Sequence, residues 1–219
     1  MENLTEIVFI LDRSGSMSGL ETDTIGGYNS FLERQKKDGV KALVSTILFD
    51  DTSKVIHDRV DLAEIKPLTD RDYYVQGCTA LLDAVGEAVR HIKTVQKYAR
   101  PEDRPEKTIF VITTDGQENS SERYSYSDVK KMISQQKEQG WEFIFLGANI
   151  DAESVAESVG IDRSRAVKYK ADHKGTEINF SVLGNIVSRF CREDLRQADF
   201  LMCKQAWAKD IEDYESGKK

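Results

Sequence analysis

The sequence predicts an α/β protein built on a doubly wound, Rossmann-like sheet of six mostly parallel strands, with one antiparallel edge strand and helices on both faces. Short apolar segments alternate along the chain with longer segments whose apolar residues recur every three or four positions, a pattern typical of parallel strands joined by helices. Several short segments are continuously apolar, as strands covered on both faces are. The 219 residues, 39% hydrophobic and 32% charged, suit one large domain or one domain with a short appendage.

The first half of the chain contains three predicted strands. Residues 7–11 form a continuous apolar run, and residues 43–49 form a second one rich in β-branched side chains. Between them lies a predicted helix that ends at Gly39. The apolar residues of this helix recur at helical spacing: Ile25, Tyr28 and Leu32. The polar residues 50–53 are typical of a turn, and the alternation over residues 55–60 predicts the antiparallel partner of a hairpin.

The middle of the chain predicts a long helix followed by two buried strands. The apolar face of the helix consists of Leu81, Leu82, Val85, Val89, Ile92 and Val95. The strands cover residues 108–113 and 141–146. A shorter helix connects them, for which we expect Ser127 as the N-cap and Gly140 as the residue that ends it.

The last part of the chain predicts a short helix over residues 151–160, an edge strand over residues 165–169 and a final helix. The apolar residues of the final helix are Ile178, Leu183, Ile186, Val187 and Phe190. We therefore expect a domain over residues 1–190 and a helical extension over residues 191–219. The extension has apolar residues at roughly helical spacing: Phe200, Cys203, Trp207, Ile211 and Tyr214. It either packs on the domain or docks on another chain.

Charge and cysteine content exclude several classes of function. The net charge of −7 argues against a general affinity for nucleic acid, which needs clustered Lys and Arg. The three cysteines, Cys78, Cys191 and Cys203, are too scattered to indicate a disulfide framework or a zinc site. The polar, acidic N-terminus differs from a secretory signal, and no apolar run reaches the roughly 18 residues of a membrane span. We therefore expect a cytoplasmic protein without a membrane segment.

The first predicted strand ends in a loop rich in oxygen ligands. Asp12, Ser14 and Ser16 lie two residues apart, with Arg13 and Gly15 between them. Carboxylate and hydroxyl oxygens are hard ligands that suit Mg²⁺ or Mn²⁺, and glycine permits the sharp turn that would aim them at one centre. By itself this pattern also occurs in ordinary turns.

Two further segments are predicted at the same edge of the sheet. Thr79 precedes the long helix, and Asp115 and Gly116 follow the strand over residues 108–113. Right-handed crossovers bring the carboxyl ends of parallel strands to one edge, where such folds bind ligands. Taken singly, Thr79 could be a helix cap and Asp115 a turn residue. Together with the first loop, they predict a site for a hard divalent cation.

These three segments resemble the metal-ion-dependent adhesion site (MIDAS) of von Willebrand factor A domains. The resemblance covers about residues 4–190, and all five ligand positions have the residue types that the family has. The resemblance implies that Ser14, Ser16 and Thr79 supply hydroxyl ligands. It implies that Asp12 and Asp115 act through bound water and through hydrogen bonds to those hydroxyls. An Asp or Glu of a protein partner would complete the coordination of Mg²⁺ or Mn²⁺. Stand-alone relatives of this kind occur in bacteria and their phages.

Charged residues are predicted around this site. Arg13 projects from the metal loop itself. Four acids lie in loops on the same edge: Asp50, Asp51, Glu118 and Asp151. The acids form either a solvated edge or a rim that selects a partner with basic residues beside its acidic one. Arg13 is expected to pair with a rim acid or to contact the ligand. Cys78, beside Thr79, is expected to be packed rather than reactive.

The preferred function is a metal-dependent protein-binding module without enzymatic activity. The alternative is a Mg²⁺-dependent phosphohydrolase, but an aspartyl-phosphate enzyme would need a second Asp where Ser14 stands, and no His or Lys is spaced as a general base. A dinucleotide-binding domain is disfavoured because Gly15 and Gly19 do not complete a Gly-x-Gly-x-x-Gly motif. The partner's identity and the oligomeric state stay open.

Overall fold

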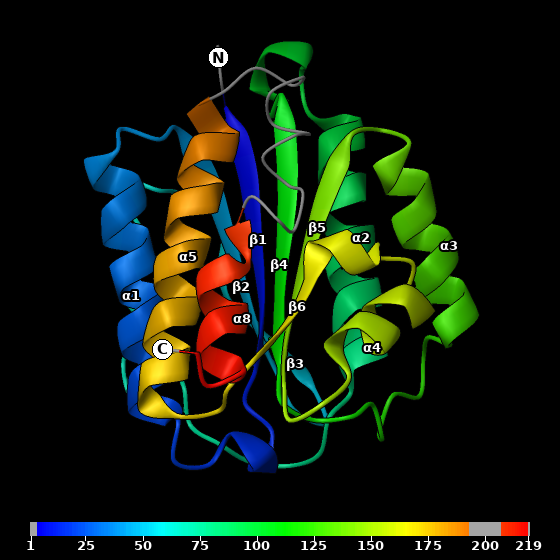
Figure 1. Cartoon of the computed structure of the whole chain (residues 1–219). Helices are drawn as coiled ribbons and strands as arrows, with labels where there is room; N and C mark the ends of the chain where they lie inside the picture. The colour runs from blue at the N-terminus through cyan, green and yellow to red at the C-terminus, as the bar shows by residue number, and fades with distance from the viewer. Residues whose placement is uncertain (1–3, 193–206, 219) are drawn as a thin grey trace.

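A computed structural model describes residues 4–192 and 207–218. Its centre is a six-stranded sheet in the order β3-β2-β1-β4-β5-β6 (Figure 1). The strands are β1 (Thr5–Asp12), β2 (Ala42–Phe49), β3 (Ser53–Asp61), β4 (Lys107–Thr114), β5 (Trp141–Ala148) and β6 (Ala166–Tyr169). All neighbouring pairs are parallel except β2 and β3. The predicted fold class, including the antiparallel edge strand, is confirmed.

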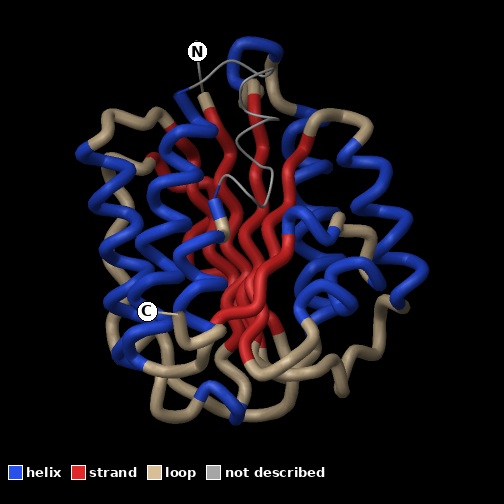
Figure 2. The backbone as a smooth tube through the Cα atoms, viewed as in Figure 1, coloured by secondary structure: helices blue, strands red, loops and turns tan. Residues whose placement is uncertain are grey.

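Helices cover both faces of this sheet, which forms the middle layer of the molecule (Figure 2). One face carries α1 (Glu21–Lys37), α5 (His173–Arg192) and α8 (Lys209–Glu215), and the other carries α2 (Leu81–Tyr98), α3 (Tyr126–Lys137) and α4 (Ala152–Ser158). Each face has its own apolar core. The chain therefore buries two layers of side chains on a single sheet.

Strand β1 lies in the middle of the sheet because its side chains are apolar on both faces. Ile7, Phe9 and Leu11 pack into the core under α1 and α5, whereas Val8 and Ile10 pack into the core under α2. Successive side chains of a strand point to opposite faces, so a continuous apolar run suits a strand covered twice. Because β1 pairs in parallel with β4, the carboxyl ends of the two strands lie side by side at the point where the strand order reverses.

The start of α3 differs from the prediction. Its N-cap is Ser125, whose hydroxyl accepts the Asp128 backbone N–H while the Asp128 carboxylate accepts the Ser125 N–H. Ser127, the predicted cap, lies inside the first turn. The reason is the capping box, which requires an acidic or amide side chain three residues after the cap, and only Ser125 has one.

The described part of the C-terminal extension packs on the same core as the rest of the chain. Helix α8 contacts β6 and α5, and Trp207 and Ile211 are buried there. Phe200 and Cys203 lie outside the described residues. Over residues 4–192 and 207–218, no helix combines the length and the apolar character needed to cross a bilayer.

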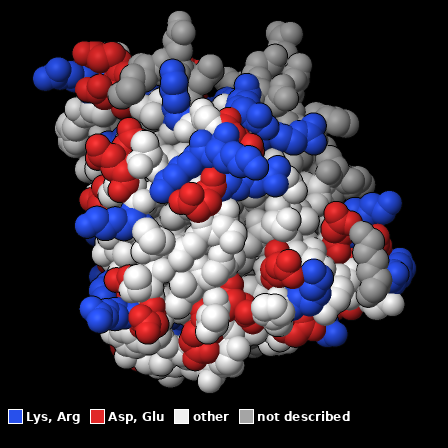
Figure 3. Space-filling view, turned by 90° about the vertical axis from the view of Figure 1, so that its left-hand side faces the viewer, with Lys and Arg blue, Asp and Glu red and all other residues white. Residues whose placement is uncertain are grey.

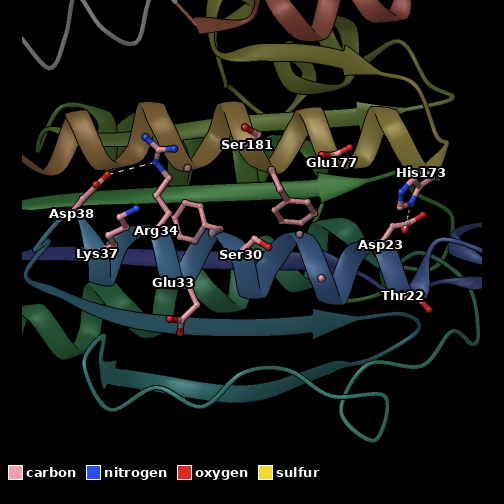
Figure 4. A pocket seen from close by; sticks show the side chains of 15 residues that line it. Thr22, Asp23, Ser30, Glu33, Arg34, Lys37, Asp38, His173, Glu177 and Ser181 are labelled. Carbon is pink, nitrogen blue, oxygen red and sulfur yellow. Dashed lines mark hydrogen bonds and ion pairs between the residues drawn. The ribbon is translucent and has the colours of Figure 1, made fainter.

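Helices α1 and α5 approach closely and leave a groove of about 810 Å³ along their outer side (Figure 4). At one end, His173 bonds to Asp23 over 2.5 Å, and this hydrogen bond raises the pKa of His173. Near the middle, the Phe180 ring lies where a side chain of Gly27 would be, since a Cβ on Gly27 would be 2.2 Å from that ring. The close contact of the two helices therefore requires glycine at position 27.

We expect Gly27→Ala to destabilise the fold by about 1–3 kcal/mol, the usual cost of overpacking a core. Gly26→Ala is the matched control, because a Cβ at Gly26 meets nothing within 4 Å. That change should instead stabilise α1 by about 0.5–1 kcal/mol, since alanine loses less backbone entropy than glycine. Urea unfolding of both variants measures the difference. Equal midpoints would contradict the proposed contact.

Candidate metal site

The loops after β1 and β4 and the loop before α2 meet at the lower edge of the sheet in Figure 1. The first loop turns through a short 3₁₀ helix over Gly15–Met17. The Ser14 and Ser16 hydroxyl oxygens are 3.2 Å apart, and Ser16 Oγ donates to Asp115 Oδ1 over 2.5 Å. The first and third predicted segments are therefore in direct contact.

Thr79 joins this group from the second loop. A Cβ placed on Gly116 would lie 2.7 Å from Thr79 Oγ1 and 3.3 Å from Ser16 Oγ. Hence the two hydroxyls and the Gly116 backbone surround one small volume, which a larger residue at position 116 would fill. The structure thus brings Asp12, Ser14, Ser16, Thr79 and Asp115 together, the five residues that the sequence predicts as the metal site.

The Asp12 side chain links the first loop to the end of β4, which carries the third loop. Its carboxylate accepts the Ser14 N–H over 2.7 Å and the Thr114 hydroxyl over 2.5 Å. The side chain is fully buried, and burial raises the pKa of Asp12. The charge of Asp115 raises it further. A buried carboxylate beside a second one is stabilised as an anion when a cation lies nearby.

The residues present fit a divalent cation. Asp115 Oδ2 is buried and has no hydrogen-bond partner among the described residues, and burial raises the pKa of Asp115. An unpaired buried acceptor costs about 1–3 kcal/mol, more when charged, so this oxygen is suited to an ion or to its bound water. Among the described residues, neither this site nor any other contains three His, Cys, Asp or Glu side chains close enough together to hold a metal ion. The available ligands are therefore mainly hydroxyls, which are hard and suit Mg²⁺ or Mn²⁺.

Thr79 is free of the capping role that its place before α2 would allow. The N-cap is Ala80, without a side-chain cap bond. The first N–H groups of α2 are instead satisfied by the loop after β4: Leu82 N donates to Glu118 Oε2 over 2.9 Å, and Asp83 N donates to Ser121 Oγ over 3.0 Å. This remote capping leaves the Thr79 hydroxyl available to the site.

The residues predicted for the partner-binding rim fall into two groups. Arg13 pairs with a rim acid, as expected: its Nη2 lies 2.7 Å from Asp50 Oδ2. The two residues are only 3% and 1% exposed, however, so neither reaches the surface. Glu118 caps α2. Only Asp51 and Asp151 are exposed, and Asp151 also caps α4 by accepting the Ser154 N–H. The rim is thus smaller than predicted, because three of its five charged side chains are engaged by other groups of the protein.

Cys78 is exposed, and the expectation that it is packed was wrong. Gly77 has a positive φ of 66°, and the Asp51 carboxylate accepts the Cys78 N–H over 2.7 Å, which turns the chain outward here. The negative charge of Asp51 raises the pKa of Cys78. The thiol is therefore accessible but less readily ionised than a free cysteine.

Some supporting residues were not found from the sequence. The Tyr73 hydroxyl donates to the Asp12 carbonyl over 2.5 Å from a buried position, and Asn119 Oδ1 accepts the Thr79 N–H over 2.9 Å. Each contact joins loops distant in sequence, so no local pattern marks these residues. Thr114 directly follows the strand predicted over residues 108–113, and nothing in the sequence shows its bond to Asp12.

The fold and this edge define a class of protein: a doubly wound α/β domain whose switch point gathers hydroxyl and carboxylate oxygens from three loops. The sequence profile of the von Willebrand factor type A domain matches residues 6–179, and the chain belongs to this family. A comparison with curated protein sequences finds no match.

Solved structures share the fold at low sequence identity. The vWF domain of the type V pili tip protein Mfa5 from Porphyromonas gingivalis has 9% identity and a TM-score of 0.60, with 87% of this chain and 97% of that one covered. The PilB minor pilin from Streptococcus sanguinis has 11% identity and a TM-score of 0.60, with 84% and 61% covered. Proximal thread matrix protein 1 from the mussel byssus, solved with a zinc-occupied MIDAS motif, has 14% identity and a TM-score of 0.56, with 84% and 46% covered. This chain therefore spans about half of the mussel protein and less than two thirds of the pilin.

Proposed function

We propose that this domain is a metal-dependent protein-binding module in which Mg²⁺, or Mn²⁺, held by the three loops binds an acidic side chain of a partner. The observation that carries the proposal is the convergence of Ser14, Ser16 and Thr79 beside Asp115, whose Oδ2 has no partner among the described residues. The mussel protein with a zinc-occupied MIDAS motif adds support from a shared fold.

The protein's own residues account for affinity toward a carboxylate. Neutral hydroxyls as the nearest ligands would leave a bound ion electrophilic, and such an ion attracts an incoming Asp or Glu. Asp115 orients the Ser16 hydroxyl, and Asp12 fixes the Ser14 backbone and the Thr114 hydroxyl. Because the two acids hold these groups in place, the loops need little rearrangement to receive an ion.

The charge on the surface favours a partner whose acid is flanked by basic residues. Asp51 and Asp151 are exposed at the edge that carries the site. Lys and Arg gather instead toward the opposite edge of the face drawn in Figure 3, where the last turn of α1 contains Arg34, Lys36 and Lys37. Complementary charges increase the rate of association and discriminate between partners.

We also propose that the domain is not an enzyme. The three histidines bond to Thr46, Asp58 and Asp23, and none of them bonds to a residue of the metal loops. None of the three histidines is therefore placed to act as a general base toward a water molecule at the site. Mg²⁺-dependent turnover of a phosphate ester that Asp12→Ala abolishes would overturn this part of the proposal.

The test of binding uses calorimetry and peptide selection. Wild type should bind Mg²⁺ and Mn²⁺, whereas the double variant Ser14→Ala/Ser16→Ala should not, since it removes two hydroxyl ligands. Ser18→Ala is the matched control, because Ser18 is exposed in the same loop and bonds to the turn through its backbone. A random peptide library bound in Mg²⁺ and eluted with chelator should yield Asp or Glu beside Lys or Arg. Equal elution from wild type and the double variant would contradict the proposal.

A further inference from the structure

We propose that the cluster of the buried Arg13 and Asp50 with the exposed Gln76 fixes the metal loops against each other and thereby makes the site selective for a small cation such as Mg²⁺ over Ca²⁺. The inference rests on the proposed function. It assigns to these three side chains a positioning role, since they bond to one another and none of them is among the five predicted site residues.

Asp50 reaches the first loop through its side chain. Asp50 follows β2, and its Oδ2 lies 2.7 Å from Arg13 Nη2. Arg13 stands between Asp12 and Ser14, so this ion pair holds the backbone segment that carries two site residues. The Arg13 N–H also donates to the Phe49 carbonyl over 2.8 Å. The first loop is thereby attached to the end of β2 at two points.

The same residue reaches the second loop in two further ways. Gln76 Nε2 donates to Asp50 Oδ2 over 2.7 Å, and the Ala80 N–H donates to the Asp50 carbonyl over 2.9 Å. Ala80 directly follows Thr79. The loops also bond to each other, because the Gln76 N–H donates to the Arg13 carbonyl over 2.9 Å. Asp50 therefore sets the position of Thr79 relative to Ser14.

The cluster is built for position more than for stability. Arg13 Nε and Nη1 are buried without a hydrogen-bond partner among the described residues, while the guanidinium lies 5.0 Å from the centre of the Tyr74 ring. A buried ion pair with unsatisfied donors contributes little net stability, and apolar residues of similar volume often serve as well. Apolar contacts are not directional, whereas the hydrogen bonds of the ion pair and of the Gln76 amide hold the loops at defined distances.

Fixed loops favour the smaller ion for a geometric reason. Mg²⁺ needs a near-octahedral set of ligands at about 2.0–2.1 Å, whereas Ca²⁺ accepts six to eight ligands at about 2.3–2.6 Å in flexible arrangements. A site whose loops cannot spread therefore penalises Ca²⁺. Loosening them should weaken Mg²⁺ binding more than Ca²⁺ binding.

The experiment compares Asp50→Asn with Glu6→Gln by calorimetry with Mg²⁺ and with Ca²⁺. Glu6 is the matched control, because it is also fully buried and paired with an arginine, Arg59, over 2.9 Å, but it lies at the opposite end of β1. We expect Asp50→Asn to weaken Mg²⁺ binding by about 10–100-fold, the usual effect of removing a group that supports ligands. Its ratio of Mg²⁺ to Ca²⁺ affinity should fall, and that of Glu6→Gln should equal the wild-type ratio.

Gln76→Met provides a second variant should Asp50→Asn fail to fold. It keeps the Arg13–Asp50 ion pair and removes only the amide that joins Asp50 to the second loop, so the selectivity ratio should fall in the same direction. Wild type that binds neither ion would overturn the proposed function itself. Wild type that binds Mg²⁺, together with a folded Asp50→Asn or Gln76→Met of unchanged selectivity, would overturn this inference alone.

Discussion

Asp12→Asn is expected to weaken Mg²⁺ binding by about 10–100-fold while leaving the ion-free protein at least as stable as wild type. The Asp12 carboxylate is fully buried, and its pKa is raised by burial. When the pKa of an acid is higher in the folded than in the unfolded protein, the free energy of unfolding falls as pH rises above the pKa of the unfolded state. The neutral amide removes this penalty together with the charge that attracts the ion.

The substitution preserves the local hydrogen bonds. In Asp12→Asn, the new side-chain oxygen would still accept the Ser14 N–H, and the new amide would donate to Thr114 Oγ1. The Thr114 hydroxyl would then donate to the Gly116 carbonyl, which lies 3.1 Å away. The stability gain of the variant should therefore be small at acidic pH, where wild-type Asp12 is protonated, and should grow as pH rises through the raised pKa of Asp12.

Thermal unfolding with Mg²⁺ and with chelator checks this prediction. Mg²⁺ should raise the unfolding temperature of wild type but not that of Asp12→Asn. Asp151→Asn serves as the control, because Asp151 is an exposed acid at the same edge and caps α4. An equal Mg²⁺ effect on Asp12→Asn and wild type would show that Asp12 does not take part in ion binding.

Asp83→Ala is expected to destabilise the fold by about 3 kcal/mol, since hydrogen bonds to a charged group contribute about 1.5–3 kcal/mol each and the released segment can partly regain them from water. Asp83 is 6% exposed, and its carboxylate accepts the N–H groups of Glu122, Arg123 and Tyr124 over 3.0, 2.9 and 2.9 Å. These bonds hold the loop that caps α2 and positions Thr79. Mg²⁺ affinity should fall with stability.

Two variants on the same helix make this prediction specific. Asp83→Asn keeps Oδ1, which accepts two of the three N–H groups, and should lose less stability than Asp83→Ala. Glu87, one turn further along α2, pairs with Arg123 at the surface, so Glu87→Ala should cost no more than about 1 kcal/mol. Urea unfolding ranks the three, and hydrogen exchange over residues 118–124 should rise only in the Asp83 variants. Equal losses for Asp83→Ala and Glu87→Ala would refute the proposed role.

The order of strands and helices was predictable because each depends on a few neighbouring residues. The continuous apolar run of β1 and the alternation in β3 are local patterns, and both strands form where those patterns lie. The five residues of the candidate site were predictable for a related reason. Each lies at or just beyond the carboxyl end of a parallel strand or before a helix, and the topology of a doubly wound sheet brings these ends together.

What surrounds the site was decided only by tertiary structure. The sequence placed Arg13, Asp50 and Glu118 on an exposed rim, but Arg13 and Asp50 are buried in an ion pair, and the half-buried Glu118 caps α2. The same holds for Cys78, which a bond to Asp51, 27 positions earlier in the chain, turns toward solvent. These outcomes depend on which loops touch. The periodicity of apolar residues extends over a single helix or strand, so it determines these elements and the edge of the sheet at which they end. Contacts between loops determine which polar groups at that edge have a hydrogen-bond partner in the protein and which are left to bind a ligand.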